Sequence, residues 1–245
     1  MTTGTLYLVP NLLGAVAPET VLPTQTLDIA RRLTHWAVET PKPARAFLKT
    51  LALSRPVAEL DIRPLPPLPP DGSVNAVEAE ALTALLAPCL AGADLGILTD
   101  AGCPGFADPG APLVALAHRY GVPVKPLVGP SSLLLALMAA GMNGQRFTFH
   151  GYLPIAEEAR GQTLRRLEQE SRQQQRATQI FIETPYRNAA LLTAIIRVLH
   201  PDSRLCVAAD LTLPSESAVT RPIREWRHVN TANYQKRPAI FLLQG

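Results

Sequence analysis

Short apolar segments alternate with helical stretches along the chain, and this alternation constrains the fold more than any other feature of the sequence. Apolar segments at residues 5–9, 95–99 and 122–127 are each long enough for one buried strand. Helical stretches at residues 112–120 and 131–140 follow the second and third of these segments. Strands that alternate with helices in this way are typical of a largely parallel sheet. The sequence therefore predicts an α/β fold.

The chain has the length of one or two domains, with 245 residues in all. A proline-dense run at residues 64–70 disfavours regular structure until residue 73. Before Gly144 we expect further helices at residues 26–36, 42–51 and 74–90.

The character of the sequence changes after Gly144, where polar segments become longer. Beyond this point we expect strands at residues 147–150, 179–182, 204–209 and 239–243, and helices at residues 156–176 and 186–199. We therefore predict two α/β domains, residues 1–144 and residues 145–245.

The composition excludes several classes of protein. Hydrophobic residues make up 47% of the chain, which is too much for a disordered protein. Charged residues make up only 18%, below the roughly 25% of an average soluble chain. A surface with so little charge favours burial against a second copy, so we expect a homodimer. The three cysteines show no CxxC spacing, which predicts neither a disulfide framework nor a zinc site.

No segment predicts export, membrane insertion or metal binding. The N-terminus lacks a basic segment followed by an apolar run, so we expect no secretory signal. The most apolar stretch, residues 133–140, is far shorter than the roughly 20 residues of a membrane span. The five histidines have no HxxxH or HxH spacing. We therefore expect a cytoplasmic protein with no membrane partner and no metal.

Basic residues concentrate in the second half of the chain. Residues 1–122 contain 8 Lys and Arg against 11 Asp and Glu, whereas residues 123–245 contain 15 against 9. Such a distribution suits an anionic substrate, and an ordinary solvated face is the alternative. The basic side chains that we expect to be exposed are Arg160, Arg165, Arg166, Arg172 and Arg176 on the predicted helix, and Arg221, Arg224, Arg227, Lys236 and Arg237 near the end of the chain.

A loop rich in glycine follows the predicted strand at residues 95–99. It contains three glycines, two prolines and two aspartates up to Gly110. In open parallel sheets, ligands bind beyond the carboxyl ends of the strands. Asp100 at such an end can accept hydrogen bonds from hydroxyl or amine groups. The alternative is turn formation, with Asp100 in an Asx-turn and Asp108 marking the start of a helix.

Two further strand ends carry candidate binding residues. Ser131 or Ser132 would cap the helix after the strand at residues 122–127, and would leave N–H groups directed at a ligand. Glu183 follows a strand in the second half, where it either contacts a ligand or forms a salt bridge with Arg187. The chain has no Gly-x-Gly-x-x-Gly at its first strand, no Walker A lysine and no Gly-x-Ser-x-Gly elbow, which disfavours dinucleotide binding, P-loop chemistry and the α/β-hydrolases.

Four motifs together resemble those of the tetrapyrrole methylase superfamily, and most closely those of its small-subunit ribosomal RNA (cytidine-2′-O)-methyltransferase I family. They are Thr-Asp-Ala-Gly-Cys-Pro at residues 99–104 with Asp-Pro-Gly at 108–110, Val-Gly-Pro-Ser at 128–131, Phe-His-Gly-Tyr-Leu-Pro at 149–154 and Ile-Glu-Thr-Pro-Tyr-Arg at 182–187. The resemblance covers most of residues 4–243 and is that of a divergent subfamily. It implies two α/β domains of tetrapyrrole methylase type, with S-adenosylmethionine in the cleft between them and RNA as the methyl acceptor.

The resemblance also implies which residues bind the cofactor. Asp100 and the backbone of its loop would hold the amino-acid end and the ribose, and the two serines would lie against the methionine side. The second domain would cover the adenosine. The implied set is Pro10, Asp100, Ala101, Gly102, Pro104, Phe106, Ala107, Ser131, Ser132, Glu183, Ala209 and Pro238.

Methyl transfer to a ribose hydroxyl requires a base that takes the hydroxyl proton. Glu39, with Lys42 nearby, is the candidate catalytic pair, and a solvated glutamate at a strand end is the alternative. The element that resembles Glu-Asp-Thr-Arg in the family is Glu-Thr-Pro-Lys at residues 39–42, and the family's Thr-Pro-Ile-Gly-Asn loop is Asn-Leu-Leu-Gly-Ala at residues 11–15. These departures leave two other functions open: a porphyrinoid C-methylase, and a non-catalytic protein that binds S-adenosylmethionine.

Overall fold

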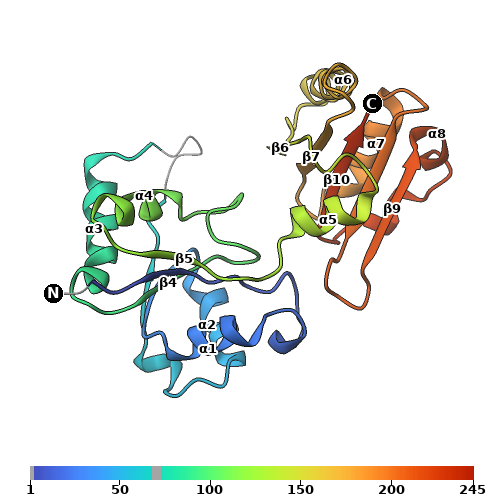
Figure 1. Ribbon diagram of the computed structural model, residues 1–245. Coiled ribbons are helices and arrows are strands. Elements are labelled where there is room, and N and C mark those ends of the chain that lie inside the picture. The colour runs from blue at the N-terminus through green and yellow to red at the C-terminus, as the bar shows by residue number, and fades with distance from the viewer. Residues whose placement is uncertain (1–2, 68–72) are drawn as a thin grey trace. The chain divides into compact units, whose positions relative to one another are not determined.

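The computed structural model describes residues 3–67 and 73–245. The chain folds into two compact units, Met1–Ser131 and Ser132–Gly245. Each unit contains one five-stranded sheet with helices on both of its faces (Figure 1). The predicted α/β class is confirmed.

All neighbouring strands in the sheet of the first unit are parallel. The strands are β1 (Leu6–Leu8), β2 (His35–Val38), β3 (Asp61–Pro64), β4 (Leu95–Leu98) and β5 (Val124–Pro126), in the order β3-β2-β4-β1-β5. Leu6 is aligned with Leu95 on one side and with Val124 on the other. Because every pair is parallel, all five strands end at the same edge of the sheet.

Helices cover both faces of this sheet (Figure 1). Helices α1 (Thr24–Arg32) and α2 (Pro41–Thr50) pack on one face, and α3 (Ala76–Leu90) and α4 (Ala111–Arg119) pack on the other. Trp36 and Phe47 belong to the first core, whereas Leu86 and Ile97 belong to the second. Short 3₁₀ turns, η1 (Pro18–Thr20) and η2 (Val57–Glu59), precede α1 and β3.

The predicted helix at residues 26–36 is wrong at its C-terminal end. Helix α1 ends at Arg32, and Trp36 lies in strand β2. The last three residues of β2 are buried because this strand lies between β3 and β4 and is covered on both faces. A four-residue strand so close to a helix gives too short a pattern for its periodicity to be recognised.

Strand β3 was also not expected, and it ends at Pro64, the first residue of the proline-dense run. Proline is tolerated there because β3 is an edge strand of the sheet. The rest of the predicted irregular run lies partly outside the described residues, since residues 68–72 are not described.

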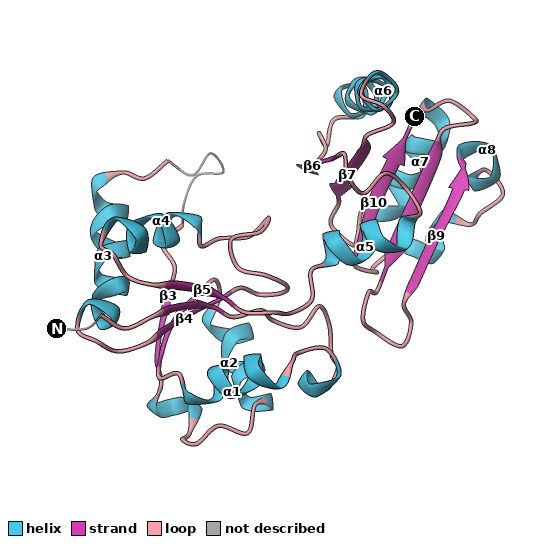
Figure 2. Cartoon of the chain, in the orientation of Figure 1, coloured by secondary structure: helices cyan, strands magenta, loops and turns pink. Residues whose placement is uncertain are grey.

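The second unit contains a mixed sheet (Figure 2). Its strands are β6 (Phe147–Tyr152), β7 (Thr178–Ile182), β8 (Arg204–Ala209), β9 (Ser217–Pro222) and β10 (Ala239–Gln244), in the order β6-β7-β10-β8-β9. Only β6 and β7 are parallel, and the other neighbours are antiparallel. The expectation of a largely parallel sheet is therefore right for the first unit and wrong for the second.

Strand β9 and the short helix α8 (Ile223–Trp226) were not predicted from the sequence. Strand β9 is an edge strand whose residues are all partly or fully exposed, so it carries no continuous apolar run. A 3₁₀ turn, η3 (Thr231–Tyr234), connects α8 to β10.

Helices α6 (Glu157–Gln173) and α7 (Asn188–Val198) pack on one face of the second sheet, and α5 (Ser132–Ala140) packs on the other. Helix α5 contacts β8, β9 and β10, and the Thr220 hydroxyl donates to the carbonyl oxygen of Ala140 at 2.8 Å. The two units consequently divide at Ser131, whereas the sequence predicted the boundary at residue 144. The physical reason is that α5 buries its apolar residues against the second sheet.

No helix within residues 3–67 and 73–245 is both long enough and apolar enough to cross a membrane.

Candidate functional site

The carboxyl edge of the first sheet brings together the predicted site residues of the first unit. Glu39 directly follows β2, whereas Pro10 and Asp100 come two residues after the ends of β1 and β4. The backbone ladder continues into this edge, because the N–H of Val9 donates to the Ile97 carbonyl at 2.9 Å. The N–H of Glu39 likewise donates to the Leu98 carbonyl at 3.0 Å. A parallel sheet presents its ligand-binding groups at this edge.

Asn11 joins two of these strand ends, a role that the sequence did not suggest. Its buried side-chain amide donates to the carbonyl oxygens of Thr99 and Asp100 at 2.9 and 3.0 Å. Its backbone N–H donates to the Gly102 carbonyl at 2.8 Å. The asparagine therefore fixes the start of the glycine-rich loop. Its only sequence signal is its place next to Pro10, where the loop departs from the family pattern.

The glycine-rich loop is held in conformations that favour glycine. Gly102, Gly105 and Gly110 have φ angles of 70°, 76° and 130°, in the region that side chains disfavour. Ala107 also lies there, with φ of 63°, although it is not a glycine. Such backbone conformations in a loop at a strand end cost free energy and cluster at ligand-binding sites.

The predicted cofactor contacts within this loop divide into an exposed and a buried group. Asp100, Ala101, Phe106 and Ala107 are exposed and available to a ligand. Gly102 and Pro104 are buried, so they contribute to binding mainly through the backbone conformation that they give the loop.

Three carboxylates lie near one another at this edge. The backbone N–H of Asp100 donates to Oε2 of Glu39 at 2.9 Å. The pKa of Asp108 is raised from 3.8 to about 6, chiefly by partial burial and then by the charges of Glu39 and Asp100, while a hydrogen bond with Thr99 opposes the shift. A carboxyl group with a pKa close to neutrality suits a general base or acid. The sequence marked Asp108 only as a turn residue, because its pKa depends on burial and on the charge of Glu39, which is distant along the chain.

Cys103, in the same loop, is not suited to be a nucleophile. Burial raises the pKa of its thiol, and the nearby Asp108 adds to this effect. Its Sγ atom lies 3.4 Å from the carbonyl oxygen of Pro130. The thiol therefore connects the glycine-rich loop to the segment that follows β5.

The segment after β5 packs against the segment after β1. A Cβ atom on Gly129 would lie 2.3 Å from Cβ of Pro10, so only glycine allows this approach. Ser131 is buried at the end of the first unit, and Ser132 is the first residue of α5.

Lys42 is exposed in the first turn of α2, three residues after Glu39. No hydrogen bond or ion pair joins these two side chains among residues 3–67 and 73–245. The structure thus brings Glu39 to Asp100 but does not pair it with Lys42.

The second sheet also gathers its predicted residues at one edge. Ile182 is aligned with Tyr152 on one side and Ile240 on the other, and Ala209 is aligned with Ala239. Glu183 and Pro238, the neighbours of these positions, therefore lie at that edge together with Ala209. The register between β6 and β7 shifts between Phe149 and Tyr152, at the His-Gly-Tyr motif.

Glu183 forms the salt bridge that the sequence left open as an alternative. Its Oε1 accepts hydrogen bonds from the Arg187 guanidinium at 2.7 Å and from the Thr184 N–H at 2.6 Å. The Glu183 side chain is only 3% exposed. This geometry gives Glu183 a structural role in the turn before α7.

A second ion pair at this edge was not predicted. The Nε atom of Arg237 donates to Oδ2 of Asp210 at 2.7 Å, and the Ser215 hydroxyl donates to the same oxygen at 2.9 Å. The two residues lie far apart in the sequence, so no local signal marks the pair. Arg237, which was expected to be free for an anionic substrate, is therefore engaged within the protein.

Within the described residues, no group of three or more His, Cys, Asp or Glu side chains is arranged to hold a metal ion.

A family model described as Tetrapyrrole (Corrin/Porphyrin) Methylases matches residues 29–226. The chain is 29% identical to the ribosomal RNA small subunit methyltransferase I of Xylella fastidiosa, over 100% of this chain and 82% of that protein. It is 32% identical to the protein of the same name from Mesorhizobium japonicum, over 89% of this chain and 67% of that protein.

Among solved structures, the methyltransferase CobJ matches with a TM-score of 0.60 and 17% sequence identity. The match covers 98% of this chain and 94% of that structure. At this identity the likeness concerns the fold alone.

Proposed function

Because the chain belongs to the tetrapyrrole (corrin/porphyrin) methylases and is an S-adenosylmethionine-dependent methyltransferase, we propose that it methylates a ribose 2′-hydroxyl of small-subunit ribosomal RNA. The relatives that span most of this chain are named ribosomal RNA small subunit methyltransferase I. The family's cofactor, S-adenosylmethionine, supplies an activated methyl group.

One observation supports a hydroxyl acceptor in particular, namely the carboxylates at the first sheet edge. A hydroxyl must lose its proton when it is methylated, whereas a ring carbon of a porphyrinoid needs much less help from a base. Glu39 and Asp108 place two carboxylates beside the exposed Asp100 loop, and the pKa of Asp108 is raised to about 6. Glu39 is the proposed base, and Lys42 in the adjacent helix turn is the proposed partner of the acceptor.

The residues present fit the cofactor. Asp100 and the loop backbone expose a carboxylate and peptide groups that match the hydroxyl and amine groups of the cofactor. The proposed contacts in the first unit are Pro10, Asp100, Ala101, Gly102, Pro104, Phe106, Ala107 and Ser131. Those in the second unit are Ser132, Glu183, Ala209 and Pro238. The part of the protein in this step is to orient the acceptor and exclude water.

We further propose that the protein works in the cytoplasm as a homodimer. Several large apolar side chains of the second unit are exposed, among them Met138 at 79% and Ile155 at 66%. Exposed apolar side chains of this kind suit a contact between protein copies.

The test of the function is a methyl-transfer assay with S-adenosylmethionine that carries a labelled methyl group. Small ribosomal subunits from cells that lack the protein, naked ribosomal RNA and a porphyrinoid are offered as separate acceptors. Labelled RNA is digested to nucleosides, and we expect the label in a 2′-O-methylnucleoside. Label on a base, or on the porphyrinoid alone, would contradict the proposal. Binding of the cofactor with no transfer to any acceptor would favour the non-catalytic alternative.

A further inference from the structure

Every charged residue of helix α2 is basic. Its sequence, Pro-Lys-Pro-Ala-Arg-Ala-Phe-Leu-Lys-Thr, contains Lys42, Arg45 and Lys49 and no acidic residue. Most basic residues of the chain lie in its second half, so this helix stands out within an acidic first half.

The three basic side chains share one side of the helix. Residues spaced by three and by four positions lie on the same face, and Lys42 to Lys49 spans about 10 Å along the axis. Ala44, Phe47 and Leu48 occupy the other side and are buried in the core under the sheet. We call the exposed side formed by Lys42, Arg45 and Lys49 the α2 basic face.

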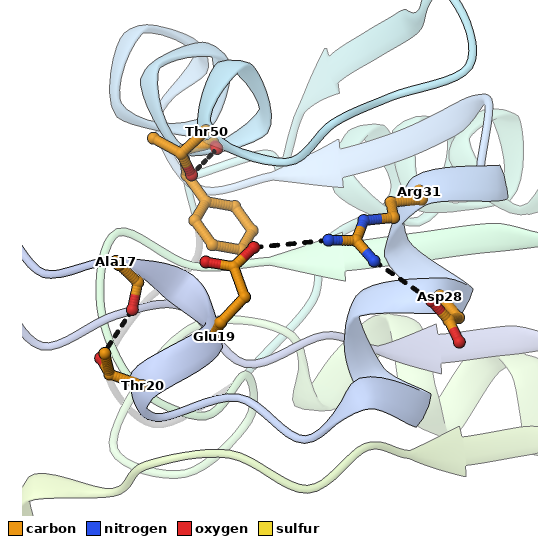
Figure 3. Close-up of polar contacts among 7 residues, drawn as sticks. Ala17, Glu19, Thr20, Asp28, Arg31 and Thr50 are labelled. Carbon is orange, nitrogen blue, oxygen red and sulfur yellow. Dashed lines mark hydrogen bonds and ion pairs between the residues drawn. The ribbon is translucent and has the colours of Figure 1, made fainter.

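These three cations have no acidic partner among the residues that the structure describes, unlike several arginines of α1 and α6. On α1, Arg31 donates to Glu19 and to Asp28 (Figure 3). On α6, Arg166 pairs with Glu170 at 2.7 Å and Arg172 lies 3.6 Å from Glu168. The helix that the sequence favoured for an anionic substrate is thus partly neutralised, whereas α2 is not.

The α2 basic face also begins next to the candidate catalytic group. Helix α2 starts at Pro41, two residues after Glu39, and Glu39 accepts the hydrogen bond from the Asp100 N–H. A chain of phosphates that crossed this face would therefore pass beside the strand ends of the first unit. An anionic membrane is a poorer match, because the helix buries its apolar side and no large apolar residue of α2 is exposed.

We propose that the α2 basic face binds the phosphodiester backbone of the RNA substrate and helps to place the acceptor ribose near Glu39. This inference rests on the proposed function and adds the surface that the RNA contacts. Phosphate contacts by Lys and Arg position a nucleic acid without reading its sequence, and they weaken steeply as salt rises.

The test compares the unmodified protein with the double variant Arg45→Gln/Lys49→Gln, which leaves Glu39 and Lys42 in place. Binding of a fluorescein-labelled single-stranded RNA is measured by anisotropy across a series of salt concentrations. Loss of two contacts should reduce the slope of log K against log salt by about 1.4, since each contact to a single strand contributes about 0.7. The KM for RNA should rise several-fold, with kcat at saturating RNA and the affinity for S-adenosylmethionine unchanged.

The matched control is Arg166→Gln/Arg172→Gln, which removes the same charge from α6. We expect this control to leave the salt slope close to that of the unmodified protein. An unchanged slope in the α2 variant, with RNA still methylated by the unmodified protein, would overturn this inference alone. Failure of the unmodified protein to methylate any RNA would instead overturn the proposed function. Binding to phosphatidylserine vesicles is measured for the same two proteins. If the unmodified protein binds the vesicles and the α2 variant does not, while RNA binding is the same in both, the inference is contradicted and the face binds a membrane.

Discussion

Glu39 and Asp100, which follow two neighbouring parallel strands, are joined by a hydrogen bond from the Asp100 backbone N–H to Oε2 of Glu39 at 2.9 Å. The bond ties the candidate base to the start of the glycine-rich loop. A side chain held in this way is positioned by the sheet itself, because β2 and β4 carry both residues. The same carboxylate raises the pKa of Asp108 through its charge.

The first prediction concerns Glu39→Gln. Glutamine keeps an oxygen that can accept from the Asp100 N–H, but it cannot take a proton from the acceptor hydroxyl. We expect kcat to fall by about 10²–10⁴, the usual contribution of a general base, with cofactor affinity within a factor of two. Single-turnover methyl transfer and isothermal titration measure the two quantities. Activity that survives in Glu39→Gln would assign proton transfer to another group, and Asp108 would then be the next candidate.

The second prediction concerns Asp100→Ala and cofactor binding. The Asp100 side chain is exposed at the strand end, and the proposed contact is a hydrogen bond from a hydroxyl or amine of S-adenosylmethionine. Loss of this acceptor should weaken the affinity by about 1–3 kcal/mol. Isothermal titration measures the change, and Asp28→Ala, at an exposed aspartate on α1, serves as the control. An affinity equal to that of the unmodified protein would leave Asp100 with a turn-forming role only.

The third prediction concerns the homodimer. Light scattering at micromolar concentration should give about twice the chain mass of 26.4 kDa. Met138, exposed on α5, offers a test of the surface, because Met138→Glu would place a charge in an apolar contact. A particle of single-chain mass at all concentrations would contradict the dimer. A dimer that tolerates Met138→Glu would place its contact elsewhere on the molecule.

The sequence predicts the parts of this fold that depend on local pattern. The strands β4 and β8 and the loop after β4 were recognised because apolar runs and glycines mark them within a few residues. Strand β2 was not recognised, since four residues next to a helix carry too little pattern.

The same limit applies to the candidate site. Glu39 and Asp100 were assigned from their places after apolar segments and from the family resemblance. The hydrogen bond from the Asn11 side chain to Thr99 and the ion pair of Asp210 with Arg237 join residues that are distant along the chain, so only the folded structure brings them together. The raised pKa of Asp108 likewise depends on burial and on the charges of Glu39 and Asp100.

The last prediction concerns Asp108 and the dependence of stability on pH. Its pKa is raised to about 6 in the folded protein, chiefly by burial and then by the charge of Glu39, whereas an unfolded aspartate titrates near 3.8. Between these two values the folded state holds more protons than the unfolded state, so the free energy of unfolding falls as pH rises through this window. Above pH 6 the full penalty of the ionised, partly buried carboxylate is present, on the order of 1 kcal/mol after solvent screening.

The variant Asp108→Asn lacks this charge. The difference in unfolding free energy between the variant and the unmodified protein should therefore shift in favour of the variant by about that much from pH 4 to pH 7.5. Urea unfolding at the two pH values measures both differences, and each protein is its own control. An equal effect of the substitution at both pH values would show that Asp108 titrates normally, and would remove it as the alternative base.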